Sequence, residues 1–160
     1  MTYDVRVLTV VSRPTVVAVG EVADLASLGD TILRLSREVY AALDAAGVDR
    51  RHRGCNVALH SGGDPLVVEV GIELVDPAGL ADLSDSLSSD GGVRLSSLPA
   101  GNVATTLHQG PYHELPAAHA AIRAWCAAGG LELAGPNWEI YGDWSDDPAK
   151  LETEVFYLLS

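Results

Sequence analysis

The chain carries the same order of secondary-structure signals twice, and this internal duplication constrains its fold more than any single motif. Four pairs of segments match in the same order: Val5-Arg6 with Val93-Arg94, residues 56–60 with 137–141, Asp64-Pro65 with Asp147-Pro148, and residues 68–70 with 153–155. Each match is weak alone, but their shared order favours a duplication. Each half contains two β-rich runs, a helical pattern and two further β-rich runs, which together predict an α+β fold.

Short β-rich runs bounded by turn residues predict the strands of the first half. Residues 5–11 and 15–21 are two such runs, and Ser12-Arg13-Pro14 between them predicts a hairpin-like connection. Two further strands are expected at residues 55–60 and 66–75. In the second half the expected strands are residues 93–98, 102–108, 137–141 and 152–159.

Helical periodicity predicts one helix in each half. The first has an apolar stripe at three- and four-residue steps: Leu25, Leu28, Ile32, Leu35, Val39, Leu43 and Ala46. Asp24 or Ser27 is expected to cap its start, and Gly47 is expected to end it. The second helix is expected to begin near Pro116 and to bury the stripe Ala118, Ile122, Trp125 and Cys126.

These signals predict one domain, residues 1–160, formed by two tandem repeats. The first repeat spans about residues 3–75, a linker rich in Asp, Ser, Gly and Leu spans residues 76–92, and the second repeat spans about residues 93–160. We expect antiparallel sheets with helices on one face, related by pseudo-two-fold symmetry. A groove along such an axis is a natural ligand pocket.

The charge balance excludes some partners. The formal net charge is −12, with only ten basic residues, whereas nucleic-acid binding needs a positive surface. We therefore expect no direct nucleic-acid contact. The chain has no apolar run long enough to span a membrane and no recognisable signal peptide, so a cytoplasmic protein is expected. Cys55 and Cys126 predict no disulfide framework and are expected to be reduced and packed.

Residues 137–141 predict the centre of a ligand site. Alternate residues of a strand share a face, so Glu139 lies with Asn137 and Tyr141, while Trp138 and Ile140 lie opposite. If the face of Trp138 packs on a helix, the carboxylate and the phenol share the other face. Such a pair suits a cation with an apolar body. The alternative is a solvated glutamate on an open sheet face.

The second half resembles the GyrI-like family, the effector-binding domain of AraC- and MerR-type multidrug-sensing regulators. The motifs that carry the resemblance are Pro99-Ala100-Gly101, His108-Gln109-Gly110-Pro111-Tyr112, Trp125, the segment 135–141 and Thr153-Glu154-Val155-Phe156. The resemblance covers nearly the whole chain and is strongest over residues 99–159. It implies strand-helix-strand-strand repeats, known as SHS2 modules, whose central groove binds bulky, often cationic, amphipathic molecules.

The resemblance also implies site residues. Glu139 takes the position of the buried acid that meets the charge of the ligand, and Tyr141, Tyr112 and Trp138 are the aromatic candidates. Trp138 is the weaker of these, because its alternation directs it toward the helices. In the duplication His60 stands where Tyr141 stands, so His60 is a further ligand-binding candidate. Glu69 and Glu154 occupy equivalent strands, so Glu154 is a further candidate for the groove, against the alternative of a surface carboxylate.

Several functions are compatible with this family. The regulators carry a DNA-binding domain upstream, whereas here the domain begins within a few residues of Met1, so we expect a stand-alone member that binds a cationic, aromatic drug-like molecule. One stand-alone branch hydrolyses the cyclopropane ring of DNA-alkylating natural products, in which case Glu139 and Tyr141 are the catalytic candidates. Another branch inhibits DNA gyrase through protein contacts. We favour non-catalytic binding over these alternatives, and the sequence is compatible with a homodimer or a protein partner.

No cofactor or metal is expected. His60, His108, His113 and His119 do not form a convincing ligand pair at helical spacing with a cysteine or an acid. Neither cysteine lies in a glycine elbow, so a cysteine nucleophile is not expected. No phosphate-loop lysine follows the paired glycines at residues 62–63 and 91–92.

Overall fold

The chain forms two compact units, and each exchanges its first predicted strand with the other. The computed structural model describes residues 2–63, 65–75, 87 and 92–160, so nearly all of the predicted linker lies outside the described residues. One unit consists of Ser12–Leu98. The other consists of the residues up to Val11 together with Pro99–Ser160. We call them the Ser12–Leu98 unit and the Pro99–Ser160 unit.

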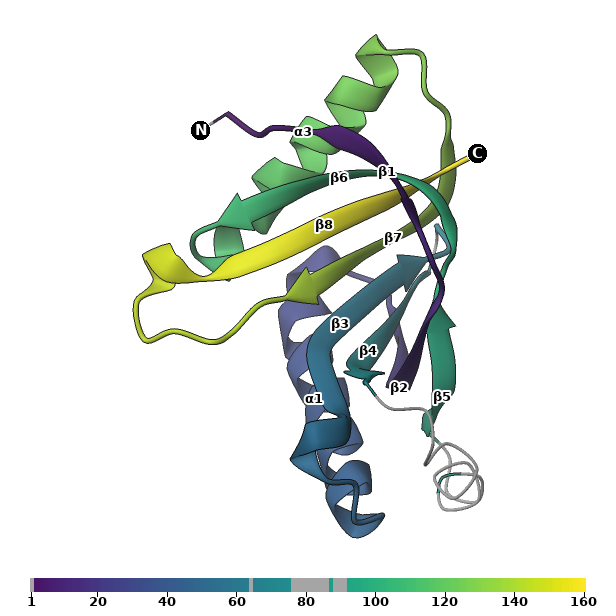
Figure 1. Cartoon of the computed structure of the whole chain (residues 1–160), viewed down its shortest axis with the longest axis vertical. Coiled ribbons are helices and arrows are strands. Elements are labelled where there is room, and N and C mark those ends of the chain that lie inside the picture. Colours follow the sequence, from purple (N-terminus) through teal and green to yellow (C-terminus); the bar gives the residue numbers. More distant parts are fainter. Residues whose placement is uncertain (1, 64, 76–86, 88–91) are drawn as a thin grey trace. The chain divides into compact units, whose positions relative to one another are not determined.

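The Ser12–Leu98 unit is a four-stranded antiparallel sheet with one long helix. Its elements are β2 (Arg13–Val22), the 3-10 turn η1 (Leu25–Ser27), α1 (Leu28–Ala45), the 3-10 turn η2 (Arg50–His52), β3 (Arg53–Ser61), β4 (Leu66–Leu74) and β5 (Val93–Leu98). The strands follow the order β3-β4-β2-β5. Helix α1 packs on β2 and β4 (Figure 1).

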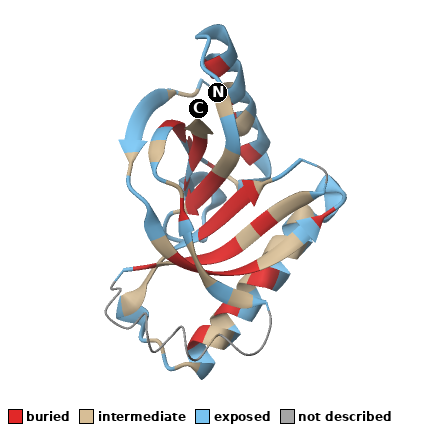
Figure 2. Cartoon of the chain, turned by 90° about the vertical axis from the view of Figure 1, so that its right-hand side faces the viewer, coloured by how far each residue is buried: buried red, intermediate tan, exposed pale blue. Residues whose placement is uncertain are grey.

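Helix α1 has the predicted apolar stripe, although the stripe is shorter than expected. Leu35, Val39 and Leu43 are buried, and Figure 2 shows such buried residues at intervals along the helix. Leu25 is 76% exposed because it lies in η1, before α1 begins. Asp24 caps that turn by accepting a hydrogen bond from the Ala26 N–H at 2.9 Å. Gly47, with φ of +72°, ends the helix as predicted.

The Pro99–Ser160 unit repeats this arrangement. Its elements are β1 (Arg6–Val10), β6 (Gly101–Gln109), the 3-10 turn η4 (Tyr112–Glu114), α3 (Leu115–Ala128), β7 (Leu133–Tyr141), the 3-10 turn η5 (Pro148–Lys150) and β8 (Glu152–Leu159). The strands follow the order β1-β6-β8-β7, all antiparallel. Each unit is therefore a strand-helix-strand-strand module with one added edge strand, which confirms the predicted α+β class.

The added edge strands correct the predicted hairpin. Strand β1 pairs with β6 rather than with β2, and β5 pairs with β2 rather than with β6. A two-residue hairpin needs positive φ angles at its turn, and no described non-glycine residue has one. The chain therefore continues through Val11-Ser12 from one unit into the other. As a result the compact units do not follow the predicted repeat boundaries.

Helix α3 begins and ends close to the predicted residues but buries a different stripe. Pro116 lies in its first turn, and Gly130, with φ of +70°, follows its end. The buried residues are Leu115, Ala118, Ile122 and Cys126, whereas Trp125 is 41% exposed. At 100° per residue, Trp125 falls on the flank of the line through Ile122 and Cys126, so the prediction that it is buried was wrong.

Helix α3 covers one face of the sheet of its unit. Its buried residues pack against Ala104 of β6 and against Val155 and Tyr157 of β8. Trp138 and Phe156 are cross-strand partners on the opposite face, where their rings stack at 5.5 Å with an interplanar angle of 11°. Cross-strand partners share a face, so this register shows which side chains of β7 and β8 lie on the face away from α3.

Close packing of β2 on β4 makes Gly71 indispensable. A Cβ atom on Gly71 would lie 1.8 Å from the Val16 carbonyl oxygen, so one of the two strands would have to move. We expect Gly71→Ala to lower the free energy of unfolding by about 1–3 kcal/mol or more, as overpacking does. Urea unfolding would measure it.

The matched control is Gly29→Ala in the first turn of α1, where an added Cβ meets nothing within 4 Å. That change should be neutral or stabilising by up to about 1 kcal/mol. Equal effects at the two positions would contradict the close-approach argument.

Candidate functional site

The carboxylate of Glu139 is buried beneath helix α3. Glu139 lies on β7 and is 5% exposed. Its cross-strand partner is Val155, which packs in the α3 core, so Glu139 faces the helix. The expectation that Trp138 faces the helix and Glu139 the open side was therefore wrong. Alternation shows which side chains share a face, but it does not show which face the helix covers.

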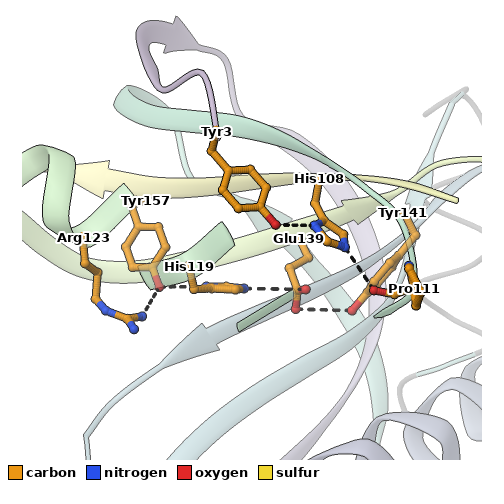
Figure 3. A network of polar contacts seen from close by, with 8 residues as sticks. All are labelled: Tyr3, His108, Pro111, His119, Arg123, Glu139, Tyr141 and Tyr157. Atoms are coloured by element: carbon orange, nitrogen blue, oxygen red, sulfur yellow. Dashed lines mark hydrogen bonds and ion pairs between the residues drawn. The ribbon is translucent and has the colours of Figure 1, made fainter. Parts of the chain in front are cut away.

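Tyr141 and His119 contact the Glu139 carboxylate from different elements (Figure 3). The Tyr141 hydroxyl, two residues along β7, donates a hydrogen bond to Oε1 at 3.3 Å. His119 of α3 places Nε2 3.6 Å from Oε2. The two residues lie on different elements and come into contact because α3 packs on this face of the sheet. A buried carboxylate needs such donors, since an unsatisfied one costs several kcal/mol.

The His119 ring contacts the Tyr157 hydroxyl, and that hydroxyl in turn contacts Arg123. Nδ1 of His119 lies 2.7 Å from the Tyr157 hydroxyl, and Arg123 donates to that same hydroxyl at 2.9 Å. The Tyr157 oxygen accepts from Arg123, so its own proton can be donated to Nδ1 of His119. His119 then carries its ring proton on Nε2, which faces Glu139. The contacts therefore form one chain, Arg123–Tyr157–His119–Glu139–Tyr141 (Figure 3).

An aromatic pair borders the carboxylate on its more exposed side. The rings of Tyr112 and Tyr141 meet edge to face, with centroids 5.6 Å apart and planes at 82°. Tyr112 is 39% exposed, while Tyr141 is half-buried. Edge-to-face pairs are favourable because the positive edge of one ring meets the negative face of the other. The pair thus presents phenol surface to solvent next to a buried negative charge.

The tyrosines of the site keep their protons well into alkaline solution. Burial, followed by the Glu139 charge, the hydrogen bond to Glu139 and the nearby Tyr112, raises the pKa of Tyr141 well above 10.0. Burial also raises the pKa of Tyr157, although the charge and hydrogen bond of Arg123 oppose it, and burial raises the pKa of Tyr112. All three phenols therefore act as hydrogen-bond donors near pH 7.

The structure brings together only some of the predicted site residues. Glu139, Tyr141 and Tyr112 form one cluster. Trp138 lies on the opposite face of the sheet, stacked on Phe156. Glu154 is the cross-strand partner of Ile140, so it also lies on that opposite face and is exposed. His60 is buried on β3 in the Ser12–Leu98 unit, and its part in a ligand site stays a prediction.

Glu154 lines a different feature of the Pro99–Ser160 unit. A pocket of about 450 Å³ is lined by Thr2, Tyr3, Asp4, Arg6, Thr105, Thr106, Leu107, Gln109 and Glu154. Neither Tyr141 nor His119, which contact Glu139 in Figure 3, lines this pocket. The structure therefore places Glu154 apart from the Glu139 cluster.

Sequence reasoning missed the polar partners of Glu139. His119 was considered only as a metal ligand, and Arg123 and Tyr157 were not considered as site residues. A signal was present, because His119 and Arg123 are one helical turn apart on a helix of otherwise uncharged residues. Two such residues on one side of an apolar helix indicate a buried polar partner.

Other chemical features are distinct from this cluster. Within the described residues, no group of three His, Cys, Asp or Glu side chains is arranged to hold a metal ion. Cys126 lies on the buried face of α3, where burial raises the pKa of its thiol, whereas Cys55 is exposed, contrary to expectation. Neither α1 nor α3 combines the length and the apolar character that crossing a membrane requires.

The chain is a small-molecule-binding domain of the GyrI-like type. It belongs to this family, because the sequence model of the GyrI-like small molecule binding domain matches residues 65–159, more than half of the chain. No protein of curated function matches its sequence. The family assignment confirms the resemblance inferred from the motifs of the second half.

Solved structures share the fold at low sequence identity. The C-terminal domain of EcmrR is 19% identical with a TM-score of 0.74, and the match covers 100% of this chain and 99% of that one. A hydrolase from Listeria innocua is 14% identical with a TM-score of 0.64, covering 98% and 91%. SAV2435 bound to tetraphenylphosphonium is 14% identical with a TM-score of 0.64, covering 100% and 94%.

The raised pKa of Tyr141 predicts a loss of stability in alkaline solution. The unfolded chain releases this proton near pH 10.0, whereas the folded chain retains it. The stabilising contribution is therefore complete below that pH and is lost as pH rises further. Urea unfolding between pH 8 and 11 should show a shallower decline for Tyr141→Phe than for the wild type. Parallel declines would contradict the proposed environment of this phenol.

Proposed function

We propose that the chain binds organic cations that carry aromatic groups, with Glu139 as the counter-charge. The observation that carries this proposal is the burial of the Glu139 carboxylate next to the Tyr112–Tyr141 pair. A carboxylate removed from water attracts a cation more strongly than an exposed one, because the medium screens the charge less. This specifies a ligand class for the small-molecule-binding domain.

The contacts that the carboxylate makes with Tyr141 and His119 are compatible with a bound cation. Tyr141 is a neutral donor, and His119 carries a charge only when it is protonated. The formal net charge of −12 acts in the same direction by raising the local concentration of cations at the surface.

The aromatic surface of the site supports the proposal that the ligand carries aromatic groups. Tyr112 and Tyr141 offer an edge and a face within one pair, and both types of surface pack well against the rings of a ligand. Cations near an aromatic face gain about 0.5–2 kcal/mol in addition. Tetraphenylphosphonium, the aromatic cation bound by SAV2435, which shares this fold, is a suitable first probe.

The charge of Glu139 should account for a large share of the affinity. Glu139→Gln keeps the shape of the side chain and removes the charge, so we expect binding of tetraphenylphosphonium to weaken by about 2 kcal/mol or more, roughly 30-fold in Kd. Isothermal titration calorimetry would measure this.

Glu154→Gln is the matched control, because it makes the same chemical change on the opposite face of the same sheet. It should leave Kd within about twofold of the wild type, as expected for an exposed charge. If both variants bind like the wild type, Glu139 is not the counter-charge. If Glu154→Gln has the larger effect, the site lies on the other face.

A hydrolytic role is the second candidate, favoured by the contact between His119 and Glu139. A carboxylate 3.6 Å from an imidazole can accept a proton from water and pass it on. We nevertheless propose binding without turnover, because every described contact of this ring and carboxylate already serves to hold the other side chains in place.

Incubation with a cyclopropane-bearing alkylating compound distinguishes the two roles. We expect mass spectrometry to recover the compound intact, in a complex of at most one equivalent. Ring opening beyond one equivalent, lost in Glu139→Gln, would contradict the binding role and establish the hydrolytic one.

A further inference from the structure

The buried His108 connects the N-terminal segment to the loop that carries Tyr112. His108 lies on β6, is completely buried, and has a hydrogen-bond partner on each ring nitrogen (Figure 3). Nε2 lies 3.0 Å from the Pro111 carbonyl oxygen, and Nδ1 lies 2.8 Å from the Tyr3 hydroxyl. Tyr3 and His108 are 105 residues apart in sequence, so this contact is a specific feature of the fold.

The chemistry of these partners determines the tautomer of the ring. A carbonyl oxygen can only accept, so Nε2 carries a proton and donates it to Pro111. In this tautomer Nδ1 is the acceptor nitrogen, and it faces the Tyr3 hydroxyl as donor. Burial and the charge of Glu114 raise the pKa of Tyr3, which keeps the proton that this hydrogen bond needs.

The Pro111 carbonyl begins the 3-10 turn that carries Tyr112. It also accepts a hydrogen bond from the Glu114 N–H at 3.1 Å, and the preceding Gly110 N–H donates to the Leu151 carbonyl at 2.8 Å. The loop is therefore held at two consecutive residues. Tyr112 follows directly, and its ring meets Tyr141 edge to face.

We propose that Tyr3 is a positioning residue of the ligand site, which acts through His108 and the Pro111 carbonyl to hold Tyr112 against Tyr141. Tyr3 contacts His108 and does not contact Glu139 or Tyr141 in the described network. Its segment is also tied to β6, since the Thr106 hydroxyl donates to the Asp4 carbonyl at 2.9 Å. This inference rests on the proposed ligand site but makes a separate claim about what holds that site in place.

Tyr3→Phe tests this claim, because it keeps the ring and removes the hydroxyl. Without the Tyr3 donor, Nδ1 of His108 should lose its hydrogen bond, which the nitrogen-15 shift of that ring nitrogen reports, and the Tyr112 ring signals should move. The Kd for tetraphenylphosphonium should rise about fivefold, the effect of one lost hydrogen bond. Tyr40→Phe is the matched control, because the Tyr40 hydroxyl donates to Asn56 in the other unit. It should change none of these readouts.

A second pair of variants separates positioning from a general loss of folding. In His108→Gln the amide nitrogen can replace Nε2 as the donor to Pro111, so we expect the Kd to stay within about threefold of the wild type. His108→Leu removes the donor and should weaken binding more than His108→Gln does. The two variants are compared at equal urea-unfolding midpoints, or after correction for any difference in folded fraction. Equal loss of binding in both variants would overturn the proposal.

The outcomes distinguish this inference from the proposed function. If the wild type does not bind tetraphenylphosphonium, but Tyr3→Phe still moves the His108 and Tyr112 signals, the ligand proposal fails and the positioning role stands. If Tyr3→Phe leaves the Tyr112 signals unchanged, the positioning role is overturned. If the wild type binds and Tyr3→Phe binds equally well, it is overturned as well.

Discussion

The burial of one carboxylate determines much of the chemistry of the Pro99–Ser160 unit. Glu139 lies under α3, where an ionised group without donors is very unfavourable. Tyr141 and His119 supply donors, and Tyr157 with Arg123 holds the His119 ring in place. The need of Glu139 for these partners thus explains why α3, an otherwise apolar helix, carries the basic residues His119 and Arg123. The same arrangement leaves a negative charge next to the exposed Tyr112, which is the basis of the proposed cation binding.

Two polar systems converge on the same aromatic pair from opposite directions. One reaches Tyr141 through the Glu139 carboxylate, and the other reaches Tyr112 through the Pro111 carbonyl and the buried His108. Rigid side chains bind ligands better than mobile ones, because less conformational entropy is lost on binding. The Pro99–Ser160 unit therefore provides both the charge of the site and the framework that keeps its rings in position.

Local sequence signals predicted the elements well because their causes are local. Strands β5 and β8 have the expected bounds, and Gly47 and Pro116 mark the helix termini as expected. The pairing of β1 with β6 was not predicted, because nothing within residues 5–21 shows which distant strand completes each sheet. Glu139 and Tyr141 were assigned to one face correctly, whereas the covering of that face by α3 depends on packing between distant residues. The helical spacing of His119 and Arg123 is visible in the sequence. It indicates a polar partner beneath the helix only when the buried Glu139 is known to need hydrogen-bond donors.

A crystal structure of the chain with tetraphenylphosphonium tests the central claim most directly. We expect the phosphorus atom to lie within roughly 6 Å of the Glu139 carboxylate, the range in which opposite charges interact strongly, with a phenyl ring against Tyr112 or Tyr141. A ligand seated instead in the pocket lined by Arg6 and Glu154, on the other face of the sheet, would contradict it.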